Sequence, residues 1–180
     1  MPWSTGMLKK NSVQIVSQNA HGLKSNERIK EITKSKTLKD RDIFTTCLQE
    51  RWRVGEEVFD INNSKFILYC LNQADQSLTG SQGVGFILNQ EAIKAWKDGG
   101  CELYKISARI IALRLLLEDR QKKTVGLFLV SAYKPVGVAD ETQWDVFLND
   151  LEECVSKKRP DDLLLIYNRL RHELKHGLLY

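Results

Sequence analysis

Two oxygen-bearing side chains stand at the ends of strand-like segments, where they could bind a metal ion or a phosphate. Asn19 ends the segment 13–19, which begins apolar and turns polar, and Glu50 follows the apolar and β-branched run 43–48. Runs of four to eight such residues are typical of buried strands. A carboxylate just beyond a strand lies at the mouth of a sheet, where open α/β sheets bind ligands. Carboxylate and amide oxygens suit Mg²⁺, so Asn19 and Glu50 are candidate ligands.

The segment between these two strands predicts that both side chains emerge at one edge. Ser25 is a plausible N-cap for a short helix that ends near Leu38. A strand–helix–strand crossover makes its two strands parallel, and parallel neighbours end at the same edge of a sheet. We therefore expect Asn19 and Glu50 to lie side by side.

The composition indicates one globular domain with a slight excess of positive charge. The chain has 180 residues, of which 42% are hydrophobic and 28% charged, and its formal net charge is +4. This charge permits a nucleic-acid partner without requiring one.

Cysteine usage and the N-terminal sequence favour an intracellular protein, cytoplasmic or nuclear. The four cysteines are far apart and form no Cys-x-x-Cys pair: Cys47, Cys70, Cys101 and Cys154. We expect them to be reduced, with no disulfide-linked partner. Residues 1–10 contain no apolar signal core. The longest apolar stretch, 110–117, is interrupted by Arg114 and is too short to cross a membrane, so we expect no membrane partner.

The remaining pattern predicts an α+β fold. Further strands are expected over 65–71, 83–88, 102–107, 109–117, 124–133 and 163–167. A second helix is expected to start at Asp140, with an apolar stripe of Trp144, Phe147, Leu148, Leu151, Cys154 and Val155. Both faces of 125–130 are apolar, so this strand is expected to be central and covered on both sides. About eight strands and two main helices favour two packed sheets with helices outside.

The order of the motifs resembles a known family. The sequence reads Gln18-Asn19-x-x-Gly22, then Leu48-Gln49-Glu50, Gly83-Val84-Gly85-Phe86, Ser107-Ala108-Arg109, Ser131-Ala132-Tyr133-Lys134-Pro135, and a helix before Asp161-Asp162-Leu163-Leu164. This order is similar to the endonuclease/exonuclease/phosphatase family, and most of all to the apurinic-type endonuclease domain of non-LTR retrotransposons. The resemblance covers about residues 12–166, after a loose segment 1–11. It implies an αββα sandwich that hydrolyses phosphodiesters in DNA with Mg²⁺ or Mn²⁺.

The resemblance also implies roles for three residues. Asn19 matches the asparagine that positions phosphate and metal, and Glu50 matches the glutamate that binds the divalent ion. Tyr133 matches the tyrosine at the rim of the active site, which contacts the scissile phosphate. In such enzymes the metal stabilises charge on the phosphate and on the leaving oxygen.

The sequence departs from the family in its last part. After the strand that ends at Ile166, the family has Gly-Asp-x-Asn, whereas this chain has Tyr167-Asn168-Arg169. The family's terminal Ser-Asp-His motif, which holds the general base, is absent from the divergent segment 167–180. Loss of a general base typically lowers a rate by about 100- to 10,000-fold. We expect a sandwich that is incomplete at its C-terminus, a truncated or decayed copy with weak or no nuclease activity.

A non-catalytic function on the same scaffold is the main alternative. Arg51 and Arg53 flank Trp52 just after Glu50, and such a basic and aromatic cluster could hold a DNA backbone or stack a base. His21, in the loop after Asn19, could approach a phosphate. The other interpretation is that Trp52 caps the core and the charged side chains are solvated.

A remote alternative is zinc hydrolysis at the end of the chain. His172, Glu173 and His176 match the His-Glu-x-x-His signature, which places both imidazoles on one helical face. A catalytic zinc site needs a third protein ligand, and only residues 177–180 follow this motif.

Overall fold

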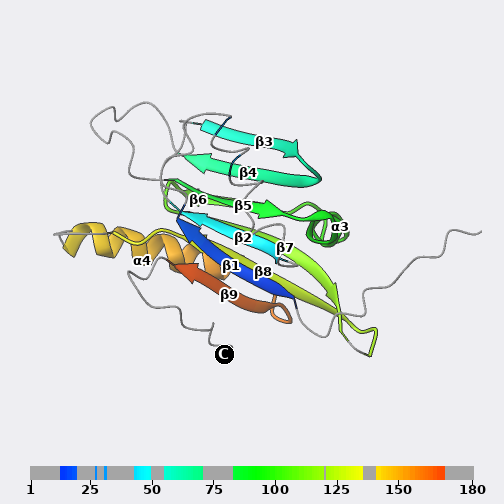
Figure 1. The fold of residues 1–180 in the computed structure, drawn as a ribbon. Coiled ribbons are helices and arrows are strands. Elements are labelled where there is room, and N and C mark those ends of the chain that lie inside the picture. The colour runs from blue at the N-terminus through cyan, green and yellow to red at the C-terminus, as the bar shows by residue number, and fades with distance from the viewer. Residues whose placement is uncertain are drawn as a thin grey trace, which may run out of the picture.

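The polypeptide folds into two mixed β-sheets with helices α3 and α4, which confirms the predicted α+β class (Figure 1). The computed structural model describes residues 13–19, 27, 31, 43–49, 55–70, 83–119, 121–135 and 141–168. Its elements are β1 (Gln14–Asn19), β2 (Ile43–Gln49), β3 (Gly55–Ile61), β4 (Ser64–Cys70), β5 (Val84–Leu88), α3 (Gln90–Asp98), β6 (Leu103–Ser107), β7 (Ile110–Glu118), β8 (Thr124–Ala132), α4 (Glu141–Ser156) and β9 (Leu163–Asn168). Neither α3 nor α4 is long and apolar enough to cross a membrane.

Each sheet combines parallel and antiparallel pairs. The first sheet has the order β1-β2-β5-β4-β3, and the second has the order β6-β7-β8-β9. Strands β1 and β2 are parallel, as the crossover rule predicted, and so are β8 and β9. All other pairs are antiparallel. Of the helix expected between β1 and β2, the structure describes only Glu27 and Glu31, both helical.

The main core lies between the two sheets, and a smaller core lies under α4. Successive side chains of a strand point to opposite faces. Leu127 and Leu129 of β8 accordingly belong to the core between the sheets. Phe128 and Val130 point to the other face and pack in one cluster with Phe147 of α4. Strand β8 is therefore covered on both faces, as its sequence predicted.

The apolar stripe predicted for α4 is only partly buried. Phe147 and Cys154 are buried, and Leu151 packs against the same cluster. Trp144 and Leu148 are exposed, the latter at 54% of its surface, so the predicted stripe is wider than the face that the second sheet covers.

Two elements were not predicted from the sequence. Strand β3 alternates exposed and half-buried residues and carries several charges, which is typical of an edge strand. Helix α3 is short, and its clearest signal is its N-cap: the Asn89 side chain accepts a hydrogen bond from the Ala92 N–H at 2.8 Å.

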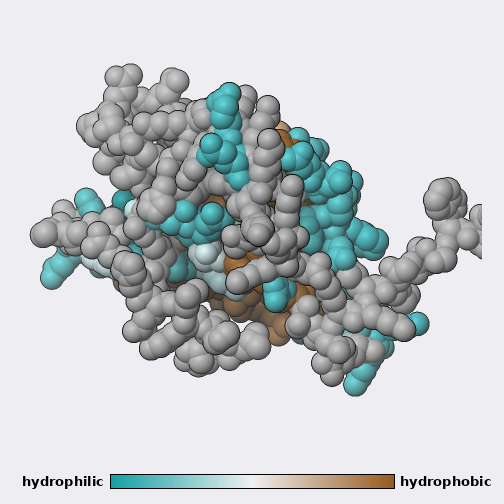
Figure 2. Space-filling view, viewed as in Figure 1, coloured by the Kyte–Doolittle hydropathy of each residue, from teal (hydrophilic) through white to brown (hydrophobic). Residues whose placement is uncertain are grey.

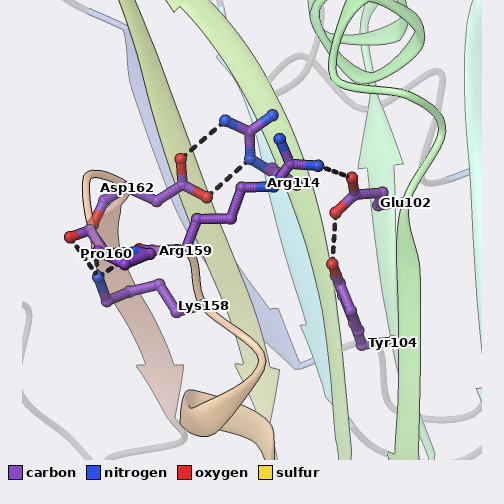
Figure 3. A network of polar contacts seen from close by, with 7 residues as sticks. All are labelled: Glu102, Tyr104, Arg114, Lys158, Arg159, Pro160 and Asp162. Carbon is purple, nitrogen blue, oxygen red and sulfur yellow. Dashed lines mark hydrogen bonds and ion pairs between the residues drawn. The ribbon is translucent and has the colours of Figure 1, made fainter.

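A buried ion pair anchors the start of β9 on the outer face of the second sheet (Figure 3). Arg114 of β7 donates from Nε and Nη2 to the two carboxylate oxygens of Asp162 at 2.7 and 2.8 Å. Beside this pair, Glu102 accepts hydrogen bonds from Arg159 and from the Tyr104 hydroxyl. Asp162 directly precedes β9, so it lies at the end of the strand opposite Asn168. Its ion pair with Arg114 stabilises the fold.

Candidate functional site

The carboxyl ends of β1, β2, β8 and β9 meet at one end of the sandwich. Asn19 is the register partner of Gln49, and Asn168 is that of Ala132. The two sheets are joined there because Gln49 Nε2 donates to Ser131 Oγ at 3.5 Å. We call this region the carboxyl-end site, made of Ser17, Asn19, Gln49, Ser131, Lys134 and Asn168.

Gln49 is fixed in the centre of the carboxyl-end site by buried hydrogen bonds. Ser17 Oγ donates to Gln49 Oε1 at 2.7 Å, and Ser131 Oγ donates to the Leu48 carbonyl at 3.0 Å. A buried amide or hydroxyl without a partner is costly, so this network favours one relative position of the two sheets. The Gln49 amide therefore has a structural role.

The loops beside the carboxyl-end site contribute positive charge. The Lys134 N–H donates to Asn168 Oδ1 at 3.2 Å, which holds the chain after β8 against the end of β9. Arg109, between β6 and β7, donates from Nη1 to the Tyr133 carbonyl at 3.3 Å. Its guanidinium carbon lies 5.6 Å from the centre of the Tyr133 ring, within reach of a cation–π interaction. Burial lowers the pKa of Arg109, although an arginine stays charged in proteins.

The predicted site residues fall into two groups. Asn19 lies at the strand end where it was expected, in register with the residue that precedes Glu50. The other predicted residues except Tyr133 lie outside the described part of the chain: His21, Glu50, Arg51, Trp52, Arg53, His172, Glu173 and His176.

Tyr133, which the resemblance places at the rim of the active site, is buried in the structure. Its side chain is only 2% exposed and belongs to the core between the sheets, so it does not form an open rim. Its position follows from the strand period, because residues 127, 129 and 131 face the same way and 133 continues the series. Tyr133 supports Arg109 rather than presenting its ring to a ligand.

The described residues can supply only part of a metal site. Among them, no group of three or more His, Cys, Asp or Glu side chains could hold an ion. The strand ends provide the amide of Asn19, and the next residue after Gln49 in the chain is Glu50, which would add one carboxylate. Mg²⁺ commonly uses one or two protein carboxylates and retains several waters, so these two side chains fit a weakly held ion.

Sequence reasoning did not assign a role to Gln49, Ser131, Lys134 or Asn168. Ser131 could have been found, because it is a polar residue inside the apolar run of a central strand.

A comparison with protein-family models gives no match to this chain, and a search of curated proteins gives none either. The chemistry of the carboxyl-end site is therefore inferred from its own residues.

Replacing Ser131 with alanine is expected to lower the free energy of unfolding by about 1–3 kcal/mol, because Gln49 and the Leu48 carbonyl lose a buried partner. Urea denaturation followed by tryptophan fluorescence would measure this change. The matched control is Ser156→Ala, which removes an exposed hydroxyl that donates to the Glu153 carbonyl. We expect the control to change stability by less than about 0.5 kcal/mol. Equal effects of the two substitutions would contradict the role assigned to Ser131.

Proposed function

We propose that this chain is a phosphodiesterase-type domain of the DNA endonuclease class, of retroelement origin, with weak or no turnover. The observation that supports the proposal best is the parallel β1–β2 pair. Its register places Asn19 beside Gln49, and the chain continues from Gln49 into Glu50. The amide of Asn19 thus lies at the end of a two-sheet sandwich, and the sequence puts a carboxylate, Glu50, one position after its register partner; in this proposal the two side chains share a divalent ion and a phosphate.

The charges at this end suit a phosphate ligand. Two basic residues lie in the segments next to the carboxyl-end site: Lys134, whose backbone N–H donates to Asn168, and Arg109, whose guanidinium donates to the Tyr133 carbonyl. Nucleic-acid affinity depends mainly on such contacts with phosphates, and it falls with rising salt. In this proposal, Asn19 orients the phosphate, and a Mg²⁺ ion, when bound, would neutralise its charge.

Turnover is expected to be weak because the described strand ends carry no general base. The last residues of β1, β2, β8 and β9 are Asn19, Gln49, Ala132 and Asn168, none of which is a histidine or a carboxylate. A missing general base typically costs about 100- to 10,000-fold in rate.

A second candidate function is DNA binding without cleavage. Two amide side chains of the carboxyl-end site stabilise the fold, which favours this function. Gln49 is hydrogen-bonded to Ser17 and Ser131, and Asn168 accepts a hydrogen bond from the Lys134 backbone N–H. A site built in this way can hold a phosphate backbone without activating water.

Cleavage and binding assays separate the two candidates. We expect the protein to bind duplex DNA, with an affinity that falls as salt rises, and to nick supercoiled plasmid slowly or not at all with Mg²⁺ or Mn²⁺. We expect Glu50→Ala to abolish any nicking and to weaken Mg²⁺ binding measured by calorimetry. The control is Glu118→Ala, an exposed carboxylate at the end of β7, opposite the carboxyl-end site.

The outcomes are distinct. Slow nicking that Glu50→Ala removes supports the phosphodiesterase, and DNA binding with no nicking in any variant supports the binding module. Rapid nicking abolished by Glu50→Ala would contradict weak turnover, and nicking that survives both Glu50→Ala and Asn19→Ala would exclude this site. The absence of DNA binding at low salt would contradict both candidates.

A further inference from the structure

The three arginines in the described part of the chain differ in how their charges are balanced. Arg114 is paired with Asp162, and Arg159 is paired with Glu102. Arg109 is half-buried, yet it forms no ion pair with any residue that the structure describes. A partly desolvated charge without a counter-charge is costly in the free protein. An arginine in such a place is a candidate for binding an anion.

Short contacts fix the position of Arg109 between β6 and β7. Its backbone N–H donates to Ser107 Oγ at 3.4 Å, and its carbonyl accepts a hydrogen bond from the Tyr133 N–H at 2.8 Å. Its guanidinium lies near the Tyr133 ring and donates one hydrogen bond to the Tyr133 carbonyl. A guanidinium carries five N–H donors, so within the described ranges most of them have no partner. The group is thus held in place with donors left for a ligand.

Asn168 provides a second donor beside the same peptide group. The carbonyl of the Tyr133–Lys134 peptide accepts a hydrogen bond from Arg109, and its N–H donates to Asn168 Oδ1 at 3.2 Å. Because the oxygen of the Asn168 amide takes that hydrogen bond, its nitrogen remains as a donor. No described residue accepts a hydrogen bond from this nitrogen. A cation and a neutral N–H donor therefore flank one peptide at the end of the second sheet.

This end of the sandwich is polar. Strands β1, β2 and β9 all run toward it, which is toward the left in Figure 1. Figure 2, drawn from the same side, shows that hydrophobic surface gathers in the lower middle of the view rather than at that end. Ile110 is the register partner of Ala132, so the preceding residue, Arg109, lies at the same end. These surroundings suit a charged ligand better than an apolar one.

We propose that Arg109, with the Asn168 amide beside it, binds the oxygens of a phosphate group without help from a metal ion. This inference rests on the proposed function, in which the ligand is a DNA phosphodiester, and it names the residue that holds the phosphate. A planar guanidinium can donate two parallel hydrogen bonds to phosphate oxygens. The bound oxyanion also supplies the counter-charge that Arg109 lacks. The same chemistry accepts a free phosphate, so both sources enter the experiment.

Thermal unfolding of the full chain in inorganic phosphate tests the site. We expect millimolar phosphate, compared with chloride at equal ionic strength, to raise the unfolding temperature of the wild type, because a ligand of the folded state stabilises it. Arg109→Gln keeps a donor for the Tyr133 carbonyl but removes the charge, so the phosphate effect is expected to vanish. In chloride, this variant should unfold at the same or a higher temperature than the wild type, because no unpaired charge is then desolvated.

Asn168→Asp is an independent variant. Its carboxylate can still accept the hydrogen bond from the Lys134 N–H, so the end of β9 stays attached, but an anion replaces the amide donor. We expect it to lose the phosphate effect, because the carboxylate repels a phosphate. Circular dichroism would show that each variant is folded. If a variant does not fold, an NMR titration of the wild type with phosphate replaces it: the Arg109 Nε–H and Asn168 Nδ2–H signals should shift.

DNA binding shows which source of phosphate the site prefers. Arg109→Gln is expected to weaken binding of duplex DNA by about 10- to 100-fold at low salt, and to lower the slope of log affinity against log salt by about one. The control Lys123→Gln removes the same charge from the hairpin between β7 and β8, at the opposite end of the sandwich. We expect it to bind nearly as tightly as the wild type. Equal affinities for DNA with and without terminal phosphates would identify the phosphodiester as the ligand.

The outcomes separate this inference from the proposed function. Stabilisation by phosphate that depends on Arg109, without any DNA binding, would support the oxyanion site and contradict the proposed function. DNA binding that Arg109→Gln leaves unchanged would contradict the inference while the proposed function stands. An Arg109→Gln variant that is less stable in chloride and still stabilised by phosphate would show that Arg109 is structural, which would overturn the inference.

Discussion

Replacing Arg114 with methionine is expected to lower the free energy of unfolding by about 3–5 kcal/mol, the usual cost of removing one partner of a buried ion pair. Arg114 and Asp162 are both buried, and the two hydrogen bonds between them are 2.7 and 2.8 Å long. The variant leaves the Asp162 carboxylate buried without its cation. Urea denaturation at pH 7 would measure the loss. The double variant Arg114→Met, Asp162→Leu is expected to recover most of it, because neither charge remains.

The pH dependence of this effect identifies its cause. Hydrogen bonding to Arg114 holds the pKa of the Asp162 carboxyl below its usual value. The pair therefore contributes stability above the unfolded pKa of about 3.9, and this contribution is lost as the pH falls through the lower folded pKa. In Arg114→Met, burial instead raises the pKa of Asp162, so the difference in stability from the wild type should shrink between pH 7 and pH 3.

An exposed arginine provides the control for this prediction. Arg159 pairs with Glu102 at the surface beside the buried pair (Figure 3). Arg159→Met is expected to cost less than about 1 kcal/mol, because exposed ion pairs contribute little. A loss in Arg114→Met that is as large at pH 3 as at pH 7 would show that lost packing, rather than the unpaired carboxylate, causes it.

Replacing Gly126 with alanine is expected to destabilise the protein by a similar amount, about 3 kcal/mol or more, because the new methyl group displaces the same ion pair. A Cβ at position 126 would lie 1.7 Å from Asp162 Oδ1 and 2.5 Å from Arg114 Nη2. The closest of these atoms belongs to a carboxylate that is held at both oxygens, so it cannot move aside without breaking its hydrogen bonds.

A double-mutant cycle tests the steric origin of this effect. In the Asp162→Ala background the carboxylate is gone, and Gly126→Ala is expected to cost much less than in the wild type. Urea denaturation of the four proteins in the cycle gives the interaction energy. Additive costs, with no interaction energy between positions 126 and 162, would contradict the proposed clash.

The parts of the fold that depend on local pattern and connection rules were predictable. The strand–helix–strand crossover expected between β1 and β2 predicted their parallel pairing, and the apolar run in β8 predicted burial on both faces. Strand β3 was missed because Glu56, Glu57 and Asp60 interrupt its apolar pattern, and the strand is stabilised by its position beside β4. The order β1-β2-β5-β4-β3 depends on pairing between distant segments, which local pattern does not encode.

The candidate site was predictable to a smaller extent. Asn19 was found because a polar residue ended an apolar strand. Gln49 and Ser131 contact each other across two sheets, and that contact depends on how the sheets pack. The period of β8 indicates that Tyr133 points inward, and its side chain is indeed buried in the core between the sheets. Whether Glu50 binds an ion remains a prediction that the Mg²⁺ measurement tests.

The hydrogen bond from Tyr167 to Ile15 joins residues 152 positions apart, which has a consequence for synthesis on the ribosome. All five strands of the first sheet precede Gln90, so this sheet can form before its covering layer exists. The roughly 80 residues from Leu88 to Asn168 take about 4–16 s to translate at 5–20 residues per second. During that interval the apolar face that includes Phe86 and Leu88 has no partner layer, and the nascent chain presents a binding surface for chaperones.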